Sequence, residues 1–187
     1  MMITAEMKEF TRIRVDYKKK NAYNEDTRIR VKPMGVVVVK RCFLFGHRDS
    51  PFEIQSSIEE AIEQHYQQYG VRQFFVGSYG SFDSMAASAL KTVKKHHTDM
   101  ELYLLIPYHP AERSTGVPEG FDNTFYPPLE RVPRRYAIVK ANRYMVETCD
   151  TIICCASHFG NTRNLLDYAW KRREKGLLIV ENLGQLW

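Results

Sequence analysis

The residues of this sequence that are best suited to chemistry are small polar and basic residues that directly follow apolar segments. One group follows the apolar segment 151–156, and its candidate ligand-binding residues are Ser157, Gly160, Asn161 and Thr162. A loop that leads from a buried strand into a helix presents unpaired backbone N–H groups at the positive end of the helix dipole. Such a loop is typical of an anion site, so we expect a nucleotide-like ligand to bind here.

Further candidates follow two other apolar segments. Gly46, His47 and Arg48 come after segment 36–45, and Gly77, Ser78, Tyr79, Gly80 and Asp83 come after segment 72–76. Arginine offers a two-pronged fork to phosphate, which makes Arg48 and Arg143 the stronger candidates for binding one. Asn142 shares a helical stripe with apolar residues, so its amide is expected to turn inward. It would then either orient a ligand or bond to the end of a strand.

Several other chemistries are disfavoured by the pattern. His47, His109 and His158 each follow an apolar segment, but no carboxylate or cysteine stands at ligand spacing, so we predict no metal site. Gly77 and Gly80 form only part of a dinucleotide-binding glycine motif, and neither a Walker loop nor a GxSxG elbow occurs. We therefore predict no bound cofactor and no serine hydrolase.

The candidate residues need a scaffold, and the rest of the sequence alternates predicted strands with predicted helices. Strands are expected over 36–45, 72–76, 101–106, 151–156 and 177–180. Four helices are expected. The first begins near Pro51, with a capping box of Ser50 and Glu53, and the second begins near Phe82. The third ends near Thr148, and the fourth covers 162–175.

This alternation predicts the α/β class, a Rossmann-like three-layer sandwich with a mostly parallel five-stranded sheet. In such sheets ligands bind beyond the C-terminal ends of the strands, where the strand order reverses. The candidates come from distant parts of the sequence, and we expect them to meet in one crevice.

The interval 107–133 lacks the pattern of either a strand or a helix, and it contains six of the eight prolines. Segments of this kind are usually lids, binding loops or disordered. Phe121, Phe125 and Tyr126 would either cover a ligand or pack onto the surface of the fold.

Residues 1–34 differ from the rest of the chain in charge and pattern. Nine Lys or Arg and five Asp or Glu give them a net charge of +4, out of +5 for the whole chain. The sequence of Thr11–Val15 recurs as Thr27–Val31, and each copy alternates Arg with Ile or Val, which predicts a basic β-hairpin. Its arginines either bind nucleic-acid phosphates or form a solvated strand face. We expect residues 35–187 to form one further domain.

The expected location of the protein is the cytoplasm, without a membrane partner. No apolar segment approaches the roughly 18 residues of a membrane helix, and the N-terminus lacks the layout of a signal peptide. The four cysteines have neither zinc-like nor CxxC spacing and are predicted to be buried thiols.

Four short motifs, in order along the chain, resemble the SLOG superfamily, the Rossmann-like group of Lonely guy phosphoribohydrolases and DprA-type DNA-processing proteins. The motifs are CFLFGHR at 42–48, VGSYGSFD at 76–83, NRYMVE at 142–147, and CDTIICCA at 149–156 with GNT at 160–162. The likeness is greatest to uncharacterised bacterial members with a GHR motif after the first strand. It covers about residues 36–181 and implies a crevice for a nucleotide-derived ligand.

The resemblance also bears on turnover. Lonely guy enzymes place a catalytic Glu three residues after the Thr of a GGxGT loop, and an Arg on the preceding helix assists at the ribose. Arg143 matches that arginine, and Asp83 is the other candidate catalytic residue, but Leu165 stands at the glutamate position. A leucine can neither stabilise an oxocarbenium ion nor activate water.

These observations favour binding or sensing of a nucleotide or nucleotide-derived ligand, by a protein that is expected to be a homo-oligomer. One alternative is a nucleotide phosphoribohydrolase, which would be an N-glycosidase in which Asp83 or Asp167 replaces the missing glutamate after a rearrangement of the site. A second alternative is nucleic-acid binding through the basic hairpin.

Overall fold

The computed structural model describes residues 39–112 and 116–186. These residues fall within one compact unit of the chain, Val38–Trp187. The predicted hairpin of residues 1–34 and the beginning of the first predicted strand at Val36 lie outside the described residues.

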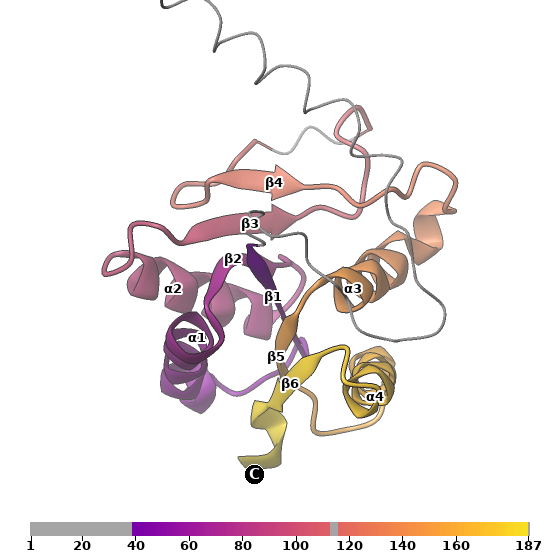
Figure 1. Cartoon of the computed structure of the whole chain (residues 1–187). Helices are drawn as coiled ribbons and strands as arrows, with labels where there is room; N and C mark the ends of the chain where they lie inside the picture. The colour runs from indigo at the N-terminus through magenta and orange to yellow at the C-terminus, as the bar shows by residue number, and fades with distance from the viewer. Residues whose placement is uncertain (1–38, 113–115, 187) are drawn as a thin grey trace, which may run out of the picture. The chain divides into compact units, whose positions relative to one another are not determined.

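The sheet of this unit has six strands, and all of its pairings are parallel. Its order is β4-β3-β2-β1-β5-β6, so the chain proceeds from β1 to one edge of the sheet and then returns to the other side of β1 (Figure 1). The strands are β1 Lys40–Gly46, β2 Val71–Val76, β3 Glu101–Leu105, β4 Asn123–Phe125, β5 Thr151–Cys155 and β6 Ile179–Asn182.

Helices cover both faces of the sheet, which confirms the predicted three-layer α/β fold (Figure 1). The helices α1 and α2 pack on one face, and α3 and α4 on the other. Their bounds are α1 Gln55–Tyr69, α2 Ser81–Lys94, α3 Ala137–Thr148 and α4 Asn161–Glu174, with short 3-10 helices at Phe52–Ile54, Arg134–Tyr136 and Leu183–Leu186.

The position of β1 between two layers of helices explains why its sequence is apolar at successive positions. Cys42 and Leu44 are buried in the core beneath α1 and α2, whereas Phe43 and Phe45 are buried beneath α3 and α4. Successive strand residues point to opposite faces, so a strand that is covered by helices on both faces carries apolar residues on both.

The structure corrects three details of the predicted elements. The sheet has six strands rather than five, because β4 lies in the interval 107–133 that was expected to lack strands. β6 begins at Ile179, not at Leu177. Ser50 and Glu53 form no capping box: the Ser50 hydroxyl donates to the carbonyl oxygen of His47 at 3.0 Å, and a 3-10 turn precedes α1.

The reversal of strand order at β1 places a crevice at the C-terminal ends of β1, β2 and β5. The loops after these strands carry most of the candidate residues. Within the described ranges, no helix has both the length and the hydropathy needed to cross a membrane.

Candidate functional site

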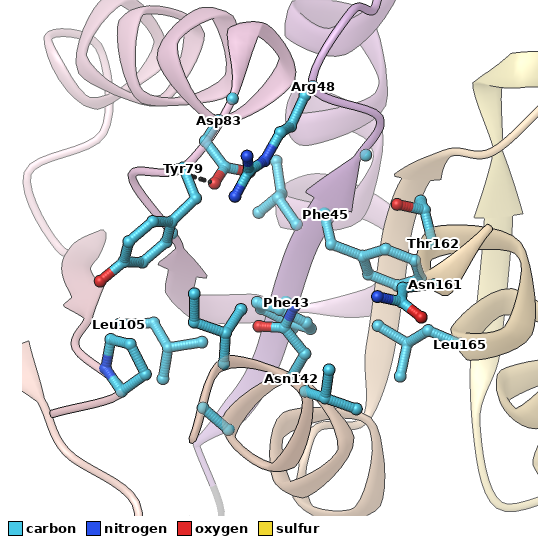
Figure 2. Close-up of a pocket in the computed structure, with 18 residues that line it drawn as sticks. Phe43, Phe45, Arg48, Tyr79, Asp83, Leu105, Asn142, Asn161, Thr162 and Leu165 are labelled. Carbon is cyan, nitrogen blue, oxygen red and sulfur yellow. Dashed lines mark hydrogen bonds between the residues drawn. The ribbon is translucent and has the colours of Figure 1, made fainter. Parts of the chain in front are cut away.

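A cavity of about 410 Å³ opens at this end of the sheet (Figure 2). Volumes of this order are usual for small-molecule sites. Its lining comes from β1, the loops after β1, β2 and β3, the helix α3 and the first turns of α2 and α4. The lining residues are Phe43, Leu44, Phe45, Gly46, Arg48, Gly77, Tyr79, Gly80, Asp83, Leu105, Pro107, Ile138, Val139, Ala141, Asn142, Asn161, Thr162 and Leu165.

The structure brings nine of the fourteen candidate residues to this cavity, although they are widely separated in the sequence. The nine are Gly46, Arg48, Gly77, Tyr79, Gly80, Asp83, Asn142, Asn161 and Thr162. The other five do not line it; they are His47, Ser78, Arg143, Ser157 and Gly160.

Two of the glycines are required by close approaches between neighbouring segments. A Cβ atom on Gly46 would lie 2.2 Å from the buried ring of Phe82, and one on Gly80 would lie 2.7 Å from Cα of Arg48. The same loops are joined by a hydrogen bond of 2.9 Å from the backbone N–H of Ser81 to the carbonyl oxygen of Arg48. The positions of Arg48 and the glycine loop are therefore fixed relative to each other.

Asp83 lies in the first turn of α2 and holds the preceding loop. Its carboxylate accepts a hydrogen bond of 2.8 Å from the backbone N–H of Tyr79 (Figure 2). Burial raises the pKa of Asp83 to about 6, and the hydrogen bond from Tyr79 and the charge of Arg48 oppose that increase. Asp83 is the only carboxylate that lines the cavity in the described part of the chain.

Two polar side chains are left available to a ligand. The guanidinium of Arg48 is exposed at the cavity and makes no hydrogen bond or ion pair with any residue that the structure describes. The carboxamide of Asn142 points into the cavity beside Phe43 (Figure 2), and among the described residues it also has no hydrogen-bond partner. Asn142 was expected either to orient a ligand or to bond to the end of a strand, and the structure shows no bond to a strand end among the described residues.

The beginning of α4 supplies the polar wall opposite to Asp83 (Figure 2). Gly160 precedes the helix with φ of +147°, and the helix has no side-chain cap, so the N–H groups of its first turn are free of such a partner. Asn161 and Thr162 of this turn line the cavity. A helix beginning of this kind attracts an anion when other basic groups lie nearby.

The remaining wall is apolar and was largely missed from the sequence. Phe43 and Phe45 contribute from β1, Leu105 and Pro107 from the end of β3, and Ile138 from α3. These residues look like core positions in the sequence, because nothing in their types distinguishes a core contact from a cavity contact. Leu165, the position of the Lonely guy glutamate, lines the same wall (Figure 2).

Arg143 lies on the exposed side of α3, outside the cavity lining. Its Nε donates to Glu147 at 3.1 Å, and its guanidinium stacks over the ring of Tyr168 at 4.1 Å. Both partners belong to the helix pair α3 and α4. The structure therefore gives Arg143 a packing role between these helices.

The aromatic residues of the interval 107–133 pack onto the fold and do not line the cavity. Phe121 packs against the core under α1 and α2, and Phe125 meets the ring of Phe75 edge to face at 5.3 Å. Tyr126 has a similar contact with His109, also at 5.3 Å. Among the described residues of this interval, only Pro107 lines the cavity.

His47 and His158 come together beside the cavity instead of lining it. Their rings stack with centroids 3.6 Å apart. Burial lowers the pKa of His47 below its ordinary value and the neighbouring His158 lowers it further, whereas Asp49 acts in the opposite direction.

No protein-family model and no curated protein matches the chain. Matches to the chain among solved structures include the following two. The molybdenum cofactor binding protein of the phototrophic bacterium Rippkaea orientalis is 14% identical with a TM-score of 0.52, and the match covers 81% of each chain. The Moco carrier protein of Chlamydomonas reinhardtii is 13% identical with a TM-score of 0.41, over 76% of this chain and 89% of that one. The first likeness agrees with the Rossmann-like α/β architecture described above.

Proposed function

We propose that the cavity binds a nucleotide or a nucleotide-derived ligand. The observation that carries this proposal is the division of one strand-end cavity into a polar, basic wall and an apolar wall. A phosphate needs the first, and a planar ring system needs the second.

Each wall supplies specific contacts. Arg48 and the N–H groups at the beginning of α4 bind the phosphate, and the glycine loop lets the ligand approach the backbone closely. Asp83 accepts hydrogen bonds from sugar hydroxyls, and Asn142 donates and accepts at the ring edge. Phe43, Phe45 and Leu165 pack against the ring.

The likeness to a cofactor-binding protein from Rippkaea orientalis supports a small organic ligand, since that protein shares the architecture that places a site at the strand ends. Membership of the SLOG superfamily stays a prediction, and so does a homo-oligomeric state. Ser78, Ser157 and Gly160 stay predicted ligand contacts, because loops beside a cavity can close over a ligand.

Thermal unfolding of the full chain with a panel of nucleoside mono-, di- and cyclic phosphates, dinucleotides and ADP-ribose derivatives tests the proposal. A ligand at 100 times its Kd stabilises the native state by about 2.7 kcal/mol. Arg48→Ala should weaken binding of that ligand at least tenfold, and Thr162→Ala should weaken it less.

Arg173→Ala is the matched control, because Arg173 is exposed at the end of α4 far along the helix from the cavity residues. Arg143→Ala decides whether Arg143 also contacts the ligand. Equal affinities of the wild type and the Arg48→Ala variant would refute the assignment, as would the absence of any shift across the panel.

A phosphoribohydrolase is the second candidate function, and Asp83 is the observation that favours it. A carboxyl group with a pKa of about 6 can exchange a proton near neutral pH, which a glycosidic cleavage requires. Release of free base from a nucleoside monophosphate, abolished by Asp83→Asn, would establish turnover. Binding without release of base would leave the chain a binding protein.

A further inference from the structure

Three potential metal ligands converge where the loops after β1 and β5 meet. His47 and Asp49 belong to the first loop, and His158 belongs to the second. The backbone N–H of His47 donates to the carbonyl oxygen of Cys155 at 3.1 Å, which fixes the first loop against the end of β5. The two imidazole rings lie face to face, with centroids 3.6 Å apart and planes inclined by 17°, so one ring must turn about its side-chain bonds before both can bind the same ion.

From this arrangement we propose that His47, Asp49 and His158 bind one divalent transition-metal ion of the zinc type. One ligand atom from each residue lies within 4.8 Å of the others. The Nε2 atom of His158 and the Oδ1 atom of Asp49 are 3.4 Å apart. Two ligand atoms that each lie about 2.1 Å from a tetrahedral ion are also about 3.4 Å apart.

The hydrogen bonds of His158 favour the form of the ring that binds a metal. Its Nδ1 atom lies 3.2 Å from the carbonyl oxygen of Phe159, which can only accept, so the proton of the neutral ring belongs on Nδ1. The Nε2 lone pair then faces the carboxylate of Asp49. Two acceptors facing each other need a proton or a metal ion between them, and a backbone carbonyl on the other ring nitrogen is the usual support of a metal-bound histidine.

The ring of His47 joins this group by turning out of its stack on the ring of His158. Its one hydrogen bond in the described part of the chain is a long contact of 3.4 Å, from the backbone N–H of His158 to Nε2. An ion on either ring nitrogen displaces no shorter hydrogen bond. The turn that carries His47 is held by Ser50, which donates to its carbonyl oxygen at 3.0 Å.

The ligand types select the class of ion. Two imidazoles and one carboxylate suit Zn²⁺, Co²⁺, Ni²⁺ or Mn²⁺, whereas Mg²⁺ and Ca²⁺ prefer oxygen ligands alone. Three protein ligands leave at least one position open. Asp49 and His158 are well exposed, with side-chain exposures of 75% and 56%, so the open position faces solvent.

The site borders the cavity, because Gly46 and Arg48 flank His47 in the chain and line that cavity. A divalent ion with one carboxylate keeps a net positive charge. If the proposed function holds, this charge lies next to the phosphate-binding wall and strengthens the binding of an anionic ligand. That consequence rests on the proposed function, whereas binding of the ion itself does not.

Titration of the chelator-treated full chain with Zn²⁺ alone, followed by calorimetry, tests the site, and visible absorption of bound Co²⁺ reports its ligands. We expect one strong site per chain. Asp49→Asn and His158→Ala should each weaken it at least tenfold, and both replace exposed side chains, so the fold should persist.

His109→Ala is the control, because His109 is an exposed histidine that lies outside the group. Absence of a strong site in the wild type would overturn the proposal, as would equal binding by the wild type and the His158→Ala variant. Because no nucleotide is present, failure here leaves the proposed function of the cavity intact, and failure of the nucleotide panel leaves the metal site intact.

Discussion

The surroundings of Asp83 act in opposite directions on its ionisation. The ionised form accepts the hydrogen bond from Tyr79 and faces Arg48, yet burial favours the neutral form strongly enough to raise its pKa to about 6. The carboxyl group therefore changes charge within the pH range in which most proteins are handled.

This titration predicts a pH dependence of stability. The folded state binds the Asp83 proton more tightly than the unfolded state, in which the pKa is near 3.8. The stability that Asp83 contributes is therefore complete below about pH 3.8 and is lost as the pH rises through 6, by about 3 kcal/mol in all. Chemical unfolding of the wild type and of Asp83→Asn between pH 4 and 7 should show this slope only in the wild type.

Asp167→Asn is the matched control, since Asp167 forms an ion pair with Arg163 on the same helix, outside the cavity. It should keep the wild-type slope. Parallel pH profiles of the wild type and Asp83→Asn would contradict the raised pKa.

At the residue scale the sequence predicts the polar part of the cavity better than the apolar part. Gly77, Asp83 and Thr162 could be selected because polar and glycine residues at strand ends are unusual for a core. Leu105 and Ile138 could not, since their cavity contacts depend on how far α3 lies from β1. The meeting of His47 with His158 depends on the paths of two loops, which no periodicity encodes.

At the scale of elements, a buried polar network joins α1 to the sheet. His65 of α1 is fully buried; its Nδ1 lies 3.0 Å from the hydroxyl of Thr151 on β5, and its Nε2 lies 2.9 Å from the carboxylate of Glu181 on β6. Buried polar groups of this kind cost free energy when a partner is removed. The network therefore fixes where α1 lies along the two strands.

Thr151→Val tests this role, because valine keeps the volume of the side chain and removes the hydroxyl. We expect the free energy of unfolding to fall by about 1–3 kcal/mol, since His65 loses a hydrogen-bond partner in the core. Thr92→Val, on the exposed side of α2, is the control and should change stability by less than about 0.5 kcal/mol. Equal, small effects in both variants would show that the network contributes little.

The elements that could be predicted from the sequence are those with continuous burial. β5 lies close to its predicted bounds because all five of its residues are buried, as expected of a strand covered on both faces, and β2 does too, although Arg72 and Gln73 near its start are only half-buried. β4 was missed because it has three residues, none of them buried, in a proline-rich interval at the sheet edge. Its pairing with β3 is a tertiary interaction that cannot be predicted from the three residues of β4 alone.

At the scale of the whole molecule, the net charge is concentrated near the N-terminus, whereas the described hydrophobic cores lie in the rest of the chain. The net charge of residues 1–34 is +4 of the total of +5, whereas both hydrophobic cores lie within Val38–Trp187. A chain of residues 35–187 should therefore fold alone, with one cooperative unfolding transition within a few degrees of that of the full chain. Calorimetry of the two chains checks this, and a truncated chain without a transition would refute it.

The same pair of chains tests the nucleic-acid alternative. If the predicted hairpin binds phosphates, the affinity of the full chain for DNA or RNA should fall steeply with salt, and the truncated chain should lose it. Equal, weak binding by both chains would refute that alternative.

Sedimentation of the full chain checks the predicted homo-oligomer.

The position of β1 in the sheet also bears on how the protein is made. β1 pairs with β2 soon after both are synthesised, but its other edge pairs Cys42 with Thr151, far along the chain. Until β5 leaves the ribosome, the nascent chain carries an apolar central strand with one edge uncovered. Such an edge invites pairing with other chains. A ribosome that stalls before residue 151 therefore releases an aggregation-prone fragment, and holdase chaperones should bind that fragment rather than the finished protein.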